Sequence, residues 1–300
     1  MKVSKLFLFI LPFFTACRTI SVHKVTRLPN ILHESSGLVV ESANRFWSHN
    51  DSGGEPILYQ FDSKGVLLKM VKIINARNVD WEDMQLDSKG NLYIADFGNN
   101  AQNRKDLVIY KIPNFKNKAQ DSVMQAEKIS FQYKEQTAFP PLGAEKHFDA
   151  EAMVVLNDTI LIFTKDFYSQ PYSGKTWINK IPNQVGQHKA QLVTVFETDK
   201  KGKYKGAITG AALSPNQHQI VLMSYQKLWI FNALQSSEKI FTDKINPVFI
   251  FGVSQFAQRE AISFLDGCTI YTTSERLKKA QGGNLSRIDI CKYLTMTFKD

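Results

Sequence analysis

A nine-residue segment recurs in register along this 300-residue chain. The copies begin at residues 34, 80, 149, 208 and 258, so successive starts lie 46, 69, 59 and 50 residues apart. Written over one another without gaps, they are ESSGLVVES, DWEDMQLDS, DAEAMVVLN, ITGAALSPN and QREAISFLD. Self-similarity with a period of about 40 to 50 residues is the sequence signature of a repeat architecture. The repeats therefore constrain the fold more than any other feature of the sequence.

Each copy is followed by a turn and by further β-rich runs. The second runs are residues 45–49, 91–95, 159–163, 219–223 and 269–273, and the third are 57–61, 107–111, 177–181, 227–231 and 284–288. A fourth, more amphipathic run leads to the next repeat, as over 67–73, 127–133 and 191–196. Four short strands in each repeat predict the blades of an all-β β-propeller. A β-sandwich, the alternative all-β fold, gives no reason for in-frame copies of one strand.

The number of blades is left open between five and six. Five repeats predict five four-stranded blades, whereas the longer spacings leave room for a degenerate sixth over residues 90–148, and insertions explain them equally well. The run 21–28 resembles the fourth strands, so we expect it to close the ring by pairing with the final blade, whose own last run is 293–298. Cys268 and Cys291 both fall in that last repeat, and an oxidising compartment would allow them to pair.

The first 16 residues have the pattern of a targeting segment. Lys2 and Lys5 accompany an apolar stretch, residues 6–14, that is too short for a normal transmembrane helix. The residues FTA before Cys17 resemble the lipobox of bacterial lipoproteins, whose cysteine is acylated; an ordinary secretory signal is the alternative. We expect an exported, membrane-anchored protein, periplasmic or at the outer membrane. Its parts are a signal peptide (1–16), the lipidated Cys17 with a tether (17–20) and a single propeller domain (21–300).

The charge pattern argues against a nucleic-acid partner. Without Lys2 and Lys5 the formal net charge falls from +9 to +7, and the remaining lysines are scattered. The densest run, residues 200–205, is typical of a solvated turn rather than of a nucleic-acid-binding surface. We expect a monomer whose partner is a small-molecule ligand or another component of the cell envelope.

Acidic residues recur at two positions of the repeat. One position holds Ser36, Glu82, Glu151, Gly210 and Glu260, and the position two residues earlier holds Glu34, Asp80, Asp149, Ile208 and Gln258. A spacing of two places both positions on the same face of a strand, and the first strand of a propeller blade lines the central channel. Carboxylates that converge there repel one another, which raises their pKa values. A hard cation such as calcium, a basic partner or water must compensate, unless the acids cap loops or pair with Arg259, Arg77 and nearby lysines.

Polar residues also follow the second strands, where loops commonly carry function. The polar tips are residues 49–54, 96–100, 165–166 and 274–276, whereas the fourth repeat has SYQ at this position and small residues in place of its acids. From these tips and the acidic positions we expect the ligand-binding residues Glu34, Asp51, Asn99, Asn100, Lys165, Asp166 and Glu275.

Three motifs carry a resemblance to known proteins. FWSHNDSG (46–53), DWED (80–83) and YIADFGNN (93–100) together resemble a group of exported bacterial propeller proteins, and more distantly the calcium-dependent propellers that include gluconolactonase-like and esterase-like phytase-type proteins. The resemblance implies a propeller with a metal held in the channel by carboxylate and amide side chains. The residues of matching type are Glu82, Glu151, Glu260, Asn50 and Asp96.

Two hypotheses about function follow. The first is a propeller of the cell envelope that binds a small ligand and a divalent cation, calcium, at an acidic channel mouth, a site that would support metal-dependent hydrolysis of an ester, lactone or phosphoester. The second is a non-enzymatic scaffold that binds a protein or glycan partner. The chain lacks the G-x-S-x-G motif of a serine nucleophile. Acids recessed in a channel would favour the first hypothesis, and acids on an outer rim the second.

Overall fold

The computed structural model describes residues 19–118, 122–233, 239–241, 248–251, 257–277 and 281–294. The expected signal peptide and Cys17 lie outside these residues. Within them, no helix is long and apolar enough to cross a membrane. The helices are short: α1 (Phe115–Lys118), α2 (Lys203–Gly206), α3 (Cys291–Leu294) and one 3-10 turn (Gly143–Glu145). The fold is therefore built almost entirely from strands, as the repeats predict.

The strands form sheets in which sequence neighbours pair antiparallel. The first sheet contains β3 (Ser35–Ser42), β4 (Arg45–Asn50), β5 (Ile57–Asp62), β6 (Leu67–Ile73) and, parallel to β6, β10 (Val123–Met124). The eight-stranded sheet contains β7 (Trp81–Leu86), β8 (Leu92–Asp96), β9 (Val108–Ile112), β11 (Glu127–Tyr133), β15 (Gly186–Glu197), β14 (Lys175–Pro182), β13 (Thr159–Thr164) and β12 (Ala150–Leu156).

Two further sheets complete the chain. One contains β16 (Gly210–Leu213), β17 (Gln219–Met223), β18 (Lys227–Asn232), β19 (Val248–Phe251) and β1 (Thr19–Ser21). The other contains β20 (Arg259–Phe264), β21 (Thr269–Ser274), β24 (Asn284–Asp289) and β2 (His23–Arg27). A small ribbon pairs β22 (Arg276–Leu277) with β23 (Gln281–Gly282).

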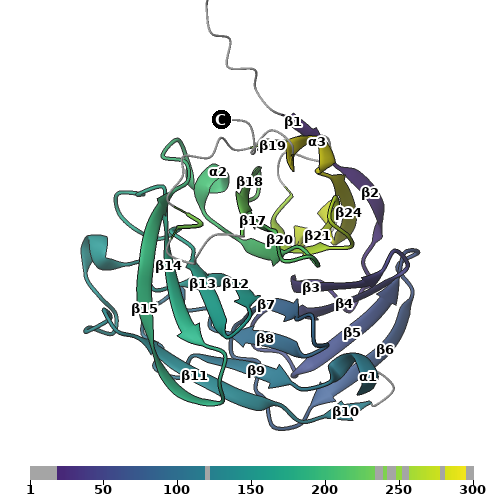
Figure 1. The fold of residues 1–300 in the computed structure, drawn as a ribbon, viewed down its shortest axis with the longest axis horizontal. Coiled ribbons are helices and arrows are strands. Elements are labelled where there is room, and N and C mark those ends of the chain that lie inside the picture. The colour runs from purple at the N-terminus through teal and green to yellow at the C-terminus, as the bar shows by residue number, and fades with distance from the viewer. Residues whose placement is uncertain are drawn as a thin grey trace, which may run out of the picture.

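The first strands of the repeats form a closed ring around the centre of the molecule (Figure 1). Strand β3 packs against β7 and β20, β12 packs against β7 and β16, and β16 packs against β20. The later strands of each repeat lie progressively farther from the centre, and β11 and β15 are outer strands that pair parallel. This radial arrangement of sheets is a β-propeller.

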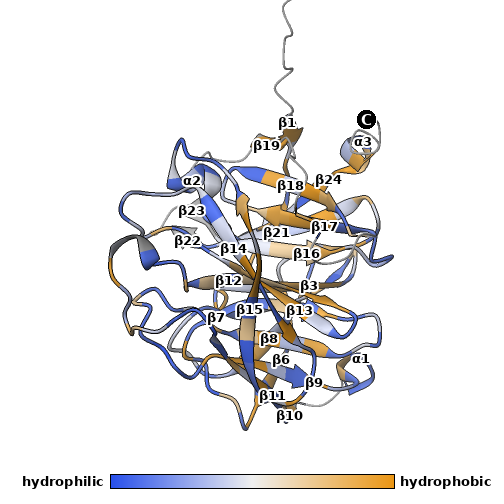
Figure 2. Ribbon diagram, turned by 60° about the vertical axis from the view of Figure 1, so that its left-hand side comes forward, coloured by the Kyte–Doolittle hydropathy of each residue, from blue (hydrophilic) through white to orange (hydrophobic). Residues whose placement is uncertain are grey.

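Apolar side chains fill the interfaces between neighbouring sheets. Trp47 of β4, for example, is buried in one cluster with Trp81 and Met84 of β7, and its ring lies 5.1 Å from that of Phe115. On the other side of the same sheet, Phe46 packs against Tyr271 of β21, with 5.0 Å between the centres of the two rings. Apolar strands joined by hydrophilic loops are visible in Figure 2. Successive residues point to opposite faces, so inner strands such as β7 and β8 are buried on both sides, whereas the outer strands β2, β6 and β15 are partly exposed.

The run 21–28 contributes β2, which joins the sheet of the final repeat and so closes the propeller, as expected. Strand β2 pairs antiparallel with β24, with His23 opposite Arg287. The expected last strand over 293–298 is wrong at its start, because residues 291–294 form helix α3; residues 295–298 lie outside the described residues. The physical reason is that β2 already occupies the outer edge of this sheet. Cys268 and Cys291 form a disulfide with a Cα–Cα distance of 4.6 Å, which ties α3 to the turn between β20 and β21.

Candidate functional site

Carboxyl groups converge where the ring strands begin. Glu82, Glu151 and Glu260 are the second residues of β7, β12 and β20, and their side chains are buried. We call the cluster that they form with the neighbouring charged residues the acidic mouth. Its carboxyl groups are those of Asp51, Asp80, Glu82, Asp149, Glu151, Glu260 and Glu275, and its ammonium group is that of Lys165.

A shift in strand register coincides with every glutamate of this set. Pairing with the second strand skips Glu82 between Trp81 and Asp83, and it skips Glu151 and Glu260 in the same way. A β-bulge leaves one residue out of the ladder and re-aims its side chain. In the fourth repeat no shift occurs, and Gly210 pairs with Met223. A Cβ at Gly210 would lie 3.1 Å from Ile262 Cγ2 of the next ring strand, a tight contact that disfavours a larger side chain at this position.

Asp51, Asp80 and Glu82 form the tightest group of carboxylates. One oxygen from each lies within 4.8 Å of the others, the spacing required to share a metal ion. Asp51 follows β4, while Asp80 and Glu82 flank Trp81 at the start of β7. We call these three residues the carboxylate triad.

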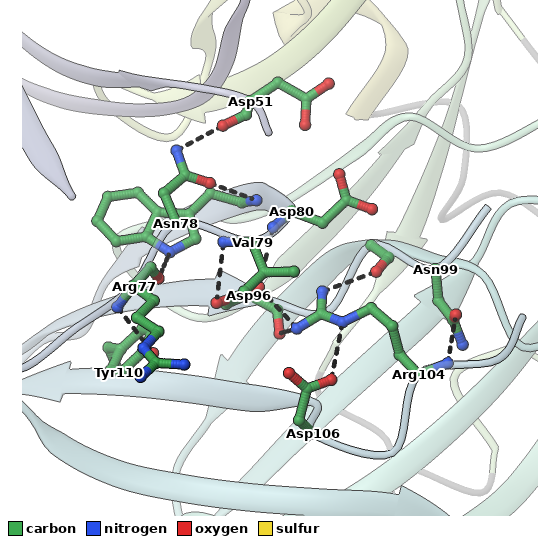
Figure 3. A network of polar contacts seen from close by, with 12 residues as sticks. Asp51, Arg77, Asn78, Val79, Asp80, Asp96, Asn99, Arg104, Asp106 and Tyr110 are labelled. Atoms are coloured by element: carbon green, nitrogen blue, oxygen red, sulfur yellow. Dashed lines mark hydrogen bonds and ion pairs between the residues drawn. The ribbon is translucent and has the colours of Figure 1, made fainter. Parts of the chain in front are cut away.

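A network of hydrogen bonds holds the backbone around Asp51 and Asp80, two members of the triad (Figure 3). Asn78 donates to the backbone oxygens of Asn50 and Asp51 and accepts a bond of 3.2 Å from the Trp81 backbone N–H. The Asp96 carboxylate accepts from the Asp80 N–H at 3.0 Å and pairs with Arg104 at 2.9 Å. Asn78 and Asp96 therefore position Asp51 and Asp80 through backbone hydrogen bonds, and they are not themselves members of the triad.

Burial and mutual repulsion raise the pKa values of the triad. Burial, followed by the charges of Asp80 and Glu151, raises the pKa of Asp51 to about 9. Burial and Glu151 raise the pKa of Asp80 to about 6, and the same two causes raise that of Glu82 well above its usual value. The protein thus holds the triad partly protonated at neutral pH unless a cation compensates.

Lys165 lies on the other side of the mouth. Its ammonium group is 3.0 Å from Glu151 Oε1 and 4.0 Å from Glu260 Oε2. Burial lowers the pKa of Lys165, but the charges of Glu151 and Glu260 outweigh it and raise this pKa well above its usual value. The Tyr225 hydroxyl donates to Glu260 Oε1 at 3.0 Å. Burial nevertheless raises the pKa of Glu260 to about 8.

One ammonium group does not balance the carboxyl groups of the mouth. Glu275 also has a pKa raised to about 7 by burial, and burial raises that of Asp149 well above its usual value. Asp51 Oδ1, Asp149 Oδ2 and Glu260 Oε2 are buried and have no hydrogen-bond partner among the described residues. Buried acceptors without partners are costly, so some group that could donate to these oxygens or neutralise them would stabilise the mouth.

Of the five residues predicted to bind metal, three lie together in the acidic mouth and two do not. Glu82, Glu151 and Glu260 come together in the mouth. Asn50 instead donates to the Ile31 backbone oxygen at 2.8 Å and accepts from the Glu34 N–H at 3.2 Å, so its amide fixes a loop. The Asp96 carboxylate is occupied by Arg104 and by the backbone of the triad.

The predicted ligand-binding residues are divided in the same way. Asp51, Lys165 and Glu275 belong to the mouth. Glu34 is exposed beside His33 and Asn100 is exposed, whereas the Asn99 side chain accepts from the Arg104 N–H at 3.0 Å. The buried Asp166 carboxylate accepts from the Ser173 N–H at 2.8 Å and from Ser169, and so fixes its own loop.

Four residues that matter here were not among the predicted site residues. Asp80 and Asp149 occupy the second acidic position of the repeat, which was the available signal. Tyr225 fills the place of a charged tip in the fourth repeat, and Arg104 lies in a loop with no repeat position, so no pattern in the sequence pointed to either.

Aromatic side chains form one wall of the mouth. Lys165 lies 5.6 Å from the centre of the Phe167 ring and 5.8 Å from that of Tyr225. Tyr168 and Tyr204 stand beside them with 49% and 54% of their surface exposed. Burial raises the pKa of Tyr168. The charge of Lys165 opposes this shift, and the charge of Asp149 adds to it. The wall therefore offers exposed ring faces next to the buried acids.

Comparisons with known proteins add little to this description. No family model matches the chain, and no curated protein sequence matches it. A solved structure to which it is similar is the crystal structure of RRP9 WD40 repeats, at 9% sequence identity and a TM-score of 0.43, covering 85% of this chain and 67% of that one. The β-propeller assignment rests on the closed ring of strands. Membership of the exported bacterial or gluconolactonase-like groups stays a prediction.

Proposed function

We propose that this β-propeller binds calcium at the carboxylate triad and, next to it, a small ligand. The observation that carries the proposal is the triad itself, in which Asp51, Asp80 and Glu82 offer oxygens within 4.8 Å of one another. Calcium takes six to eight oxygen ligands, and carboxylates are its usual protein ligands. Surplus negative charge in the mouth and buried oxygens without partners support a divalent cation.

The depth of the acids favours this function over a scaffold for a macromolecular partner. Glu82, Glu151 and Glu260 are 4%, 3% and 7% exposed, so a protein surface could not reach them directly. A bound divalent cation would supply Lewis-acid polarisation of an ester, lactone or phosphoryl oxygen. Among the chain's own groups, Glu260 has a pKa of about 8 and would hold a proton at neutral pH, and Lys165 fixes the position of Glu151. Hydrolysis is accordingly the first activity to screen.

The proposal includes five four-stranded blades. The parallel pairing of β11 with β15 joins two groups of four strands into the eight-stranded sheet, and each of these groups begins at the ring. Described residues between 90 and 148 supply strands of the second blade and β10, which leaves no ring strand for a sixth.

The proposal also includes a lipid anchor at Cys17. In the sequence, only Arg18 separates this cysteine from Thr19, the first residue of β1. An acylated Cys17 would therefore hold the sheet that contains β1 and β19 close to the membrane surface, in the cell envelope.

Calorimetric titration with calcium tests the proposal. The chain from Thr19 onward contains every described strand, and after chelator treatment we expect it to bind calcium stoichiometrically. Glu82→Gln should weaken the affinity by about 100-fold, because calcium affinity follows the charge count of its ligands. The matched control is Glu55→Gln, which removes an exposed carboxylate paired with Lys72 at 3.3 Å. No binding by the parent chain, or equal affinity in both variants, would refute the calcium site.

Gly98→Ala offers a second test of the triad. A Cβ at Gly98 would collide with Glu82 Oε1 and the Asp80 carboxyl group, so alanine should displace two of the three ligands. We expect calcium affinity to fall by about tenfold, as is common when the surroundings of a ligand change. Gly54→Ala is the control, because its Cβ would meet only Asn78 Nδ2, at 3.9 Å. Equal calorimetric affinities of the two variants would contradict the placement of the triad.

A further inference from the structure

A cavity lies at the opposite end of the ring from the acidic mouth. It has a volume of about 740 Å³, and it is lined by residues near the ends of all the ring strands, among them Val40, Met84, Val155, Ala212 and Phe264. The acids of the mouth lie near the beginnings of the same strands. On β7, Glu82 and Leu86 are four residues apart, a separation of about 13 Å. The cavity is therefore distinct from the proposed calcium site.

Gln85 separates the two sites. Its side chain is buried and donates to the Ala211 backbone oxygen at 2.9 Å. This hydrogen bond joins β7 to β16, two strands that are not neighbours in the ring. The Asp83 carboxylate next to it accepts from the Met153 N–H at 2.8 Å and the Met84 N–H at 2.7 Å. The buried side chains of Asp83 and Gln85 therefore lie along β7 between the acids of the mouth and the cavity.

The chemistry of the cavity favours a neutral ligand. Its acids are Asp87 and Asp158 and its bases are Lys89 and Lys111, so the formal charges cancel. Asp87 is already engaged by the N–H groups of Lys89 and Asn91 at 2.9 and 2.8 Å. The floor, formed by ring-strand residues, is mainly aliphatic, and the rim is polar. The C–H faces of a compact, hydroxyl-rich molecule would pack on this floor, and its hydroxyl groups would bond to the polar groups of the rim.

A fixed acceptor stands at the rim. The Tyr93 hydroxyl donates to the Asp87 carboxylate at 3.1 Å, so its oxygen can only accept from the Asn183 amide, which lies 3.0 Å away. This contact orients Asn183 with its NH2 group toward Tyr93. Its Oδ1 is buried and has no hydrogen-bond partner among the described residues. A ligand with O–H donors would satisfy that oxygen.

We propose that this cavity, which we call the far cavity, binds a neutral saccharide. A volume of this size is usual for a small-molecule site. The aromatic rings at the cavity, Tyr93 and Phe264, are buried in the core, so no exposed ring face is available for a nucleobase to stack on. A polyol ring needs donors and acceptors of the kind that Asn183, Ser263 and Gln217 carry along the lining.

An array of neutral mono-, di- and trisaccharides tests this proposal, with sialylated and phosphorylated glycans and nucleosides as comparison. We expect the chain from Thr19 onward to bind at least one neutral saccharide. Asn183→Ala should weaken that affinity by about tenfold, the effect of losing a hydrogen bond to the ligand. The matched control is Asn75→Ala, which removes bonds of 2.8 and 2.9 Å to Ala126 outside the cavity.

Two further measurements keep the outcome decisive. Leu213→Trp, at a half-buried lining position, should weaken saccharide binding by obstructing part of the far cavity, and a thermal melt checks that it folds. Glu82→Gln or added chelator should leave saccharide binding unchanged, since the calcium site is separate. Absence of binding to every neutral saccharide, preference for charged glycans or nucleosides, or binding that survives both cavity variants would overturn the proposal without affecting the calcium site.

Discussion

Replacing Lys165 with methionine is expected to lower the free energy of unfolding by about 3 to 5 kcal/mol at about pH 8 in the absence of calcium. The ammonium group lies 3.0 Å from Glu151 and 4.0 Å from Glu260, and it is the only cation within the acidic mouth of the described chain. Methionine keeps most of the aliphatic stem but leaves buried carboxylates without a counter-charge. Urea denaturation of both proteins measures the difference.

Lys200→Met is the matched control. Lys200 also pairs with a glutamate, Glu197, at 3.2 Å, but both side chains are 64% exposed. The control should change the free energy of unfolding by no more than about 0.5 kcal/mol, because exposed ion pairs contribute little. The cost of Lys165→Met should shrink at about pH 5, where Glu260, with its pKa raised to about 8 by burial, binds a proton instead. A cost as small as that of the control at both pH values would contradict the central role of Lys165.

The ring of strands and the position of the acids could be predicted from the sequence. Glu82, Glu151 and Glu260 share one place in a repeat, and equivalent residues of a propeller face one axis. The pairing of the N-terminal run with the final repeat followed from the same periodicity. Such features depend on local pattern repeated along the chain, which is what a single sequence records.

The pairing of individual side chains could not be predicted. Asn50 and Asp96 are of the right chemical type for a metal, yet loop backbone and Arg104 occupy them. Arg104 comes from a loop outside the repeat, so no register could place it beside Asp96. The bulges are also hidden, because the ring strands are buried on both faces and so carry no buried/exposed alternation that a one-residue shift in pairing would interrupt. The far cavity is hidden for a similar reason, since its lining comes from every repeat and from several turns.

The pH dependence of stability follows from the raised pKa values. A carboxyl whose pKa is higher in the folded state than in the unfolded chain keeps its proton over a pH range in which the unfolded chain has lost it. Its stabilising contribution is complete below the unfolded pKa and is lost as the pH rises through the folded pKa. For the mouth, these folded pKa values are about 6 for Asp80, about 7 for Glu275, about 8 for Glu260 and about 9 for Asp51.

The calcium-free protein should therefore lose about 6 kcal/mol of unfolding free energy between about pH 6.5 and about pH 9. Burial lowers the pKa of His49 to about 4, which has the opposite sign but acts only below the range chosen. Saturating calcium should remove most of the loss, because the cation replaces the protons, and calcium uptake should release protons at about pH 7. Urea denaturation with chelator and with calcium gives both curves. Stability that rises with pH in the chelated protein, or two curves that stay parallel, would show that the mouth neither holds these protons nor exchanges them for calcium.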